Sequence, residues 1–167
     1  MPYTPVKHLE YNLWANSKLG EFISKADEKL FDTEVVSSFS SLRQTVYHVW
    51  DAEAIWLMRL QGVSPNAWPS KIFQGSRDEC LSQFIQNSKA FHDFILSQKG
   101  SFIESNILYK NLKGDEFQST AEEIIMHVVN HGAFHRGQMI TILRTLGFTQ
   151  LGSTDLITFL RLQKSSL

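Results

Sequence analysis

The sequence predicts an all-α protein, a four-helix bundle with a short β-hairpin or loop before the last long helix and a short C-terminal helix. Two observations carry this prediction. Apolar residues recur at the three-to-four spacing of amphipathic helices through four long segments. Ser or Thr begins each segment, and Gly stands at or just beyond the ends of most of them. Short connections favour a bundle, and without a linker or an internal repeat we expect residues 1–167 to form one domain.

The first helix is expected to begin at Thr4 and Pro5. Threonine is a common N-cap, and proline is favoured at the first helical position because its missing N–H would have no partner there. Apolar residues then follow one stripe through residues 6–26, for example Leu9 and Ile23.

The second helix is expected from about Ser41 to Gln61. Ser41 and Gln44 have the spacing of a capping box, and Gly62 occupies the position just past the helix end. Its sequence is apolar enough to be largely buried. Residues 62–76 contain two prolines and two glycines and are predicted to form a loop.

The third helix is expected to follow Ser76, which forms a second capping box with Glu79, and its segment ends at Gly100. The hydrophobic period then changes. Residues 106–119 have β-favouring side chains on both sides of Gly114, which predicts a short exposed hairpin or, failing that, a plain loop.

The last long helix is expected to begin at a third capping box, formed by Thr120 and Glu123. It should extend to about Leu146 and end at Gly147. A short final helix is expected over roughly residues 154–163.

Composition excludes several classes of function. The net charge is −1 and no basic run is present, which argues against a nucleic-acid partner. A single cysteine, Cys80, excludes an internal disulfide and a cysteine-rich zinc site. No apolar stretch approaches the roughly 20 residues that span a bilayer, and the N-terminus lacks a signal-peptide pattern. We therefore expect no membrane association and a cytoplasmic location.

Three of the six histidines, His127, His131 and His135, follow each other at intervals of four residues. This spacing puts them on one helix face, where two neighbouring imidazoles can bind the same metal ion. All three span about 12 Å at a rise of ~1.5 Å per residue, so they cannot share one ion. The spacing leaves both neighbouring pairs possible, and a third ligand must come from elsewhere.

His48 is the best candidate for that third ligand because it lies among apolar residues of the second helix, where an imidazole needs a partner. The simpler alternative is a hydrogen-bonded core histidine. Asp51 and Glu53 could be further ligands or could orient an imidazole. Trp14 and Trp56 fit either the core or the wall of a pocket.

Four stretches of the chain resemble the DinB-like family of bacterial helical-bundle metalloproteins, which includes the YfiT-type proteins. They are "YNLWAN" (residues 11–16), "SFSSLRQTVYHVWDAEAIWLMRLQG" (residues 38–62), "HVVNHGAFHRGQMITILRTLG" (residues 127–147) and "STDLITFL" (residues 153–160). The third stretch is the most specific, with two histidines four apart followed by Arg-Gly-Gln.

The resemblance implies a mononuclear divalent metal ion held by His48, His131 and His135, with zinc and nickel as the first candidates. It thereby selects the 131/135 pair over the 127/131 pair. Three protein ligands would leave a position open to water or substrate. Similar proteins often form homodimers. Further candidates for the pocket or its surroundings are His127, Asn130, Arg136, Glu53, Trp56 and Trp14.

For function, the resemblance implies a metal-dependent enzyme acting on a small-molecule substrate. The first hypothesis is a thiol-dependent S-transferase for small electrophiles, with a low-molecular-weight thiol such as bacillithiol or mycothiol as cofactor. The reacting group would then be a thiol or a water on the ion, and no side chain is assigned a catalytic role. The alternatives are a metal-dependent hydrolase of small molecules and a non-catalytic protein that binds a metal or ligand.

Overall fold

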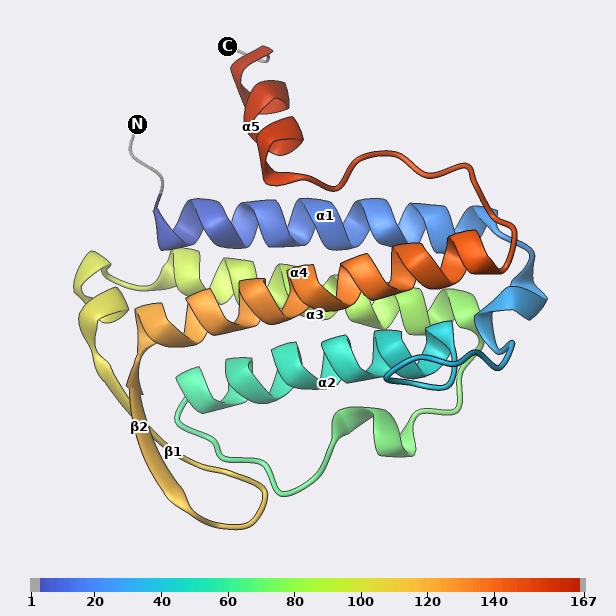
Figure 1. Ribbon diagram of the computed structural model, residues 1–167. Coiled ribbons are helices and arrows are strands. Elements are labelled where there is room, and N and C mark those ends of the chain that lie inside the picture. The colour runs from blue at the N-terminus through green and yellow to red at the C-terminus, as the bar shows by residue number, and fades with distance from the viewer. Residues whose placement is uncertain (1–3, 166–167) are drawn as a thin grey trace.

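The computed structural model describes residues 4–165. Its four long helices pack side by side (Figure 1). The described elements confirm the predicted fold class. The long helices are α1 (Pro5–Lys25), α2 (Leu42–Leu60), α3 (Arg77–Ser97) and α4 (Ala121–Thr145). The hairpin strands β1 (Asn106–Lys110) and β2 (Glu116–Thr120) precede α4, and the short helix α5 (Leu156–Ser165) follows it.

The helix starts expected from the sequence are confirmed by hydrogen bonds, although of the capping box expected for Ser41 and Gln44 only the bond from the Gln44 N–H to the Ser41 hydroxyl is formed. The Thr4 side chain accepts from the Lys7 N–H. Ser76 and Glu79 form a reciprocal capping box, as do Thr120 and Glu123. Each box satisfies backbone N–H groups that the first turn of a helix leaves unpaired.

The sequence did not predict three short 3-10 helices, η1 (Glu28–Phe31), η2 (Pro69–Ile72) and η3 (Gly100–Glu104). Gly100 therefore begins a 3-10 turn, whereas α3 already ends at Ser97. Each of these turns lies in a connection and is too short to show a helical pattern of apolar residues.

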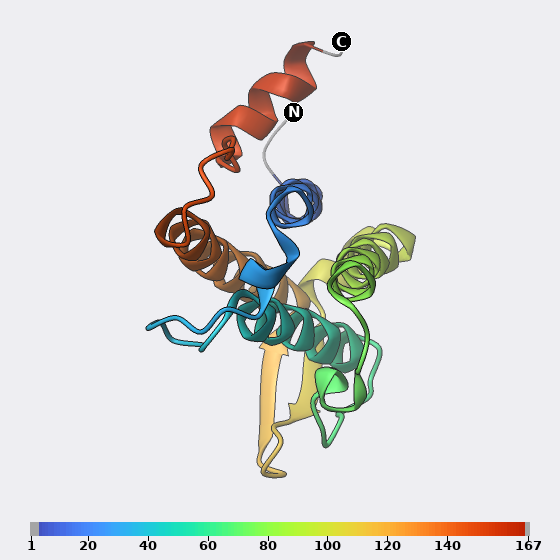
Figure 2. The same cartoon turned by 90° about the vertical axis from the view of Figure 1, so that its right-hand side faces the viewer.

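The four long helices form a diamond when viewed nearly end-on, with α1 and α2 at opposite corners (Figure 2). α1 and α2 each pack against both α3 and α4. Apolar side chains from all four helices form much of the core, for example Leu19, Val46, Phe84 and Leu143. Because α1 and α2 lie diagonally, residues 26–41 must cross one end of the bundle to connect them.

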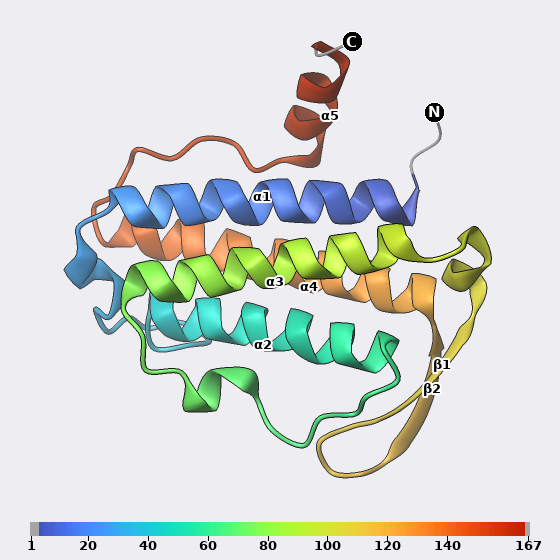
Figure 3. The same cartoon turned by 180° about the vertical axis from the view of Figure 1, so that it is seen from behind.

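The hairpin extends beside α2, on the side of the bundle away from α5 (Figures 2 and 3). Its strands are antiparallel in the register Asn106↔Thr120, and Tyr109 packs its ring edge-on against Trp56 of α2, with centroids 5.0 Å apart. α5 packs on α1 through Phe159, which is buried and contacts Trp14. Among residues 4–165, no helix is long and apolar enough to cross a membrane.

Candidate metal centre

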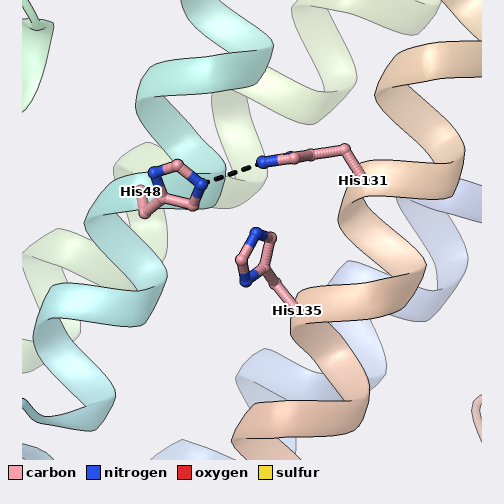
Figure 4. Close-up of side chains that lie close together, drawn as sticks. All are labelled: His48, His131 and His135. Atoms are coloured by element: carbon pink, nitrogen blue, oxygen red, sulfur yellow. Dashed lines mark hydrogen bonds between the residues drawn. The ribbon is translucent and has the colours of Figure 1, made fainter. Parts of the chain in front are cut away.

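Three histidines from two helices converge on one point of the bundle. His48 projects from α2, and His131 and His135 project from successive turns of α4 (Figure 4). One ring nitrogen of each lies within 4.8 Å of the others. The Nε2 atoms of His48 and His131 are 2.9 Å apart. The structure therefore brings together the three histidines that the family resemblance predicts as ligands.

The spacing of these nitrogen atoms fits a single metal ion. Two imidazoles bound to one zinc at ~2.0–2.1 Å hold their nitrogens about 3.4 Å apart in tetrahedral geometry. The observed separations, from 2.9 Å up to 4.8 Å, lie on both sides of that value, so small side-chain rotations suffice. An all-imidazole set suits zinc, nickel, copper or iron.

The electrostatic environment keeps two of these imidazoles in the form that binds metals. Burial and the nearby His135 lower the pKa of His48 below its ordinary value. Burial, His135, His48 and His127 together lower the pKa of His131 to about 4. Both rings are therefore neutral at pH 7, which is the charge state that a histidine ligand requires.

Gln138 orients the third imidazole, and the sequence reasoning missed it. Its Oε1 lies 2.7 Å from Nδ1 of His135, and its Nε2 donates to Oγ of Ser38 at 2.9 Å. A carboxamide oxygen can only accept, so Nδ1 of His135 carries the proton. The lone pair of His135 is then on Nε2, where it is available to an ion. The available signal was an amide three residues after a candidate ligand, on the same helix face.

Phe39 covers the cluster from the segment that crosses the end of the bundle. Its ring stacks on His48 with centroids 4.4 Å apart and tilts against His135 at 5.7 Å. Phe134 also contacts His135 edge-on, with centroids 5.0 Å apart, and 64% of Phe134 is exposed. Neither phenylalanine carried a signal in the sequence that would separate it from ordinary core residues.

Two of the further candidates, His127 of α4 and Trp56 of α2, continue the row of aromatic contacts beyond His131. The His127 ring lies 5.8 Å from His131 and 5.3 Å from Trp56. His127 is not part of the three-nitrogen cluster. Burial and the charge of Arg59 lower the pKa of His127.

The remaining candidates are elsewhere. Trp14 packs against Phe159 of α5, and Asn130 is exposed. Glu53 and Arg136 are almost wholly buried, at 0% and 2% exposed, and hydrogen-bond inside the bundle. The structure brings none of these four into the histidine cluster.

Asp51, a further carboxylate near His48 in sequence, is also engaged elsewhere. Its two carboxylate oxygens accept from the backbone N–H and the hydroxyl of Ser70, at 2.7 and 2.6 Å. The cluster of His48, His131 and His135 thus includes no acidic ligand within the described residues.

Comparisons with known proteins agree with this architecture. The model of the DinB family matches residues 1–165. Protein DinB of Bacillus subtilis (strain 168) is 24% identical over 166 residues, which cover 95% of each chain.

Solved structures show the same fold. A DinB-like protein from Bacillus cereus ATCC 10987 superimposes with a TM-score of 0.68 at 16% identity, covering 88% of this chain and 95% of the other. YfiT from Bacillus subtilis, described as a probable metal-dependent hydrolase with an unusual four-helix bundle topology, gives a TM-score of 0.70 at 13% identity. That match covers 89% of this chain and 91% of YfiT.

Proposed function

The chain belongs to the DinB family, and from this premise we propose that it is a metal-dependent enzyme acting on a small molecule. His48, His131 and His135 would hold one divalent ion. The observation that carries the proposal is the convergence of three imidazole nitrogens within 4.8 Å. Three protein ligands leave coordination positions open, which is typical of catalytic rather than structural sites.

A divalent ion in this site would act as a Lewis acid and lower the pKa of a water or thiol ligand toward neutrality. The protein's own side chains prepare the site for it. Gln138 and Ser38 hold His135 in the tautomer with a free Nε2. Phe39 lies against His48 and His135 and limits access of water to both rings.

We favour a thiol-dependent S-transferase as the specific activity. Asp51 and Glu53, the carboxylates near His48 in sequence, hydrogen-bond to other groups, so neither is available as a general base. A thiol bound to the ion would release its proton to solvent and would not need a carboxylate base. The chain's own thiol is unsuitable, since Cys80 is buried and burial raises its pKa to about 12. The thiol would therefore be a small molecule.

Metal-dependent hydrolysis is the second candidate because YfiT, which shares the fold, is described as a probable hydrolase. His127 is the side chain best placed to accept a proton in that reaction. It lies beside His131, and its lowered pKa keeps it neutral at pH 7.

Elemental analysis tests the metal. Wild type and the His48→Ala variant are purified without a histidine tag and their metal content is measured. We expect about one equivalent of a divalent metal in wild type and a large loss in the variant. Equal, negligible metal in both proteins would refute the proposal.

Turnover then separates the two reactions. Metal-loaded protein is mixed with small thiols and an electrophile, and separately with model esters. Metal-dependent consumption of thiol supports the transferase. Ester hydrolysis that disappears in the His131→Ala variant, without thiol consumption, supports the hydrolase.

A further inference from the structure

Five polar side chains lie at the centre of the bundle, behind the histidines. Each long helix contributes at least one of them, and none is more than 3% exposed. They are Asn12 and Asn16 of α1, Glu53 of α2, Ser88 of α3 and Arg136 of α4. Polar groups buried this deeply are costly unless they are hydrogen-bonded, so their arrangement calls for a physical reason.

The two asparagines bridge a buried cation and a buried carboxylate. Nη1 of Arg136 donates to Oδ1 of Asn12 and to Oδ1 of Asn16, both at 2.7 Å. The Nδ2 atoms of the same amides donate to Oε1 of Glu53 at 2.7 and 2.9 Å. Ser88 completes the set by donating its hydroxyl to Oε2 of Glu53 at 2.5 Å. We call these five residues the central network.

Gly132 makes room for the central network. A Cβ atom at this position would lie 2.9 Å from Nη1 of Arg136 and 2.9 Å from Oδ1 of Asn12. Side chains on a helix lean toward its N-terminus, so the Arg136 guanidinium covers the turn that contains residue 132. Any larger residue there would displace the guanidinium from the asparagines.

The central network also sets the direction in which the histidines point. Gly132 and Arg136 directly follow His131 and His135, so the two pairs lie about 100° apart around α4. When Arg136 is bound to α1, the histidine pair faces α2. On α2, Glu53 is about 140° from His48, so binding Glu53 at the bundle centre turns His48 toward α4.

We propose that the central network positions the three histidines by fixing the rotation of α2 and α4 about their axes. This inference rests on the proposed function, because the histidines need fixed positions only if they bind an ion. The positions of their rings can nevertheless be tested without a metal. Apolar replacement of a buried ion pair often leaves stability unchanged, so the role assigned to these directional bonds is to set the orientation of the helices. Arg136, Glu53, Asn12, Asn16 and Ser88 are therefore positioning residues and do not touch a substrate.

Two glycine variants on α4 test the proposal. Gly132→Ala introduces a methyl group against Arg136 and Asn12, whereas a Cβ at Gly137 meets no atom within 4 Å. In metal-free protein, nuclear Overhauser contacts between the His48 and His131 rings report their positions. We expect these contacts to weaken in Gly132→Ala and to persist in Gly137→Ala.

Co²⁺ gives a second readout, through its visible absorption and its affinity. Gly132→Ala should bind Co²⁺ roughly ten-fold or more weakly, which is the size of effect that loss of support around a ligand produces. Its absorption spectrum should change shape, because the imidazoles are redirected. Gly137→Ala should match wild type in both measurements.

Asn12→Ala provides an independent variant in case Gly132→Ala does not fold. It removes one bridge and leaves Asn16 joined to both Arg136 and Glu53. Unchanged ring contacts and Co²⁺ affinity in the folded variants would overturn the proposal, as would loss of folding in both. If wild type binds no Co²⁺, the proposed function fails, but the ring contacts still decide whether the network positions the histidines.

Discussion

The Nε2 atoms of His48 and His131 lie 2.9 Å apart, although 83 residues separate the two histidines in the chain. At this distance one ring must donate a proton and the other must accept it. The two nitrogens that share this proton are among the three that converge in the histidine cluster. A bound ion would take the proton's place, so binding should displace it without rebuilding the site.

The histidine pair that binds the metal can be identified by single substitutions. We expect His131→Ala and His135→Ala each to weaken metal binding by more than the roughly 10–100-fold that loss of a supporting hydrogen bond costs. His127→Ala should change the affinity only slightly, because His127 lies outside the three-nitrogen cluster. Titration against a chelator measures all three. A loss in His127→Ala equal to the other two would instead favour the 127/131 pair.

Gln138→Leu tests the support of His135. The substitution removes the acceptor 2.7 Å from Nδ1 and allows the ring to rotate or change tautomer. We expect metal affinity to fall by about 10–100-fold, with little change in thermal stability. Gln83→Leu, at an exposed position of α3, is the matched control. Equal affinities in the two variants would show that Gln138 does not support the site.

The ion pair between Asp32 and Arg43 predicts a pH-dependent contribution to stability. Arg43 contacts both carboxylate oxygens of Asp32, at 2.5 and 2.9 Å, and attaches the crossing segment to α2. These hydrogen bonds lower the pKa of Asp32 below 3.8. Since the folded state binds this proton less tightly than the unfolded state, the contribution is present above pH 3.8 and is lost as the pH falls further.

The measurement is urea unfolding of wild type and Asp32→Asn at pH 7 and at about pH 3. Because the Asp32 side chain is 59% exposed, we expect a difference below about 1 kcal/mol at pH 7, and less at the acidic pH. Glu116→Gln removes a longer, more exposed pair on the hairpin and serves as control. A difference that grows as the pH falls would contradict this sign.

Cys80 should not react in the folded protein. It is wholly buried, and burial raises its pKa to about 12, so almost no thiolate exists at pH 7–8. We expect no modification by iodoacetamide under native conditions and complete modification in denaturant. Rapid labelling of the native protein would show that the thiol is accessible, and Cys80 would then be a candidate nucleophile.

Helix starts and the hairpin could be predicted because their causes are local. A capping box such as Thr120 with Glu123 is complete within four residues. The turn of the hairpin is marked by Gly114, which has a positive φ. The choice between the two histidine pairs could not be derived from spacing, since both pairs have the same separation on α4. It depends on which turn of α4 faces His48, which is a property of tertiary packing.

The support around the histidines was also beyond local reasoning. Ser38 and Gln138 meet across 100 residues, and Phe39 reaches His48 only because its segment folds back over the bundle. Glu53 was a candidate because it lies near His48 in the sequence, and Arg136 because its charge could bind an anionic ligand. Their actual partners, Asn12 and Asn16, are on a helix that has no sequence proximity to either.

The diagonal placement of α1 and α2 determines what lies over the imidazoles. If these helices were adjacent, a tight turn could join them and no chain would pass over the imidazoles. The longer crossover supplies Ser38, which bonds to Gln138, and Phe39, which stacks on His48. Changes at these two positions would therefore reach the histidines beneath them. A connection between diagonal helices thus couples the sequence of a surface segment to the arrangement of side chains inside the bundle.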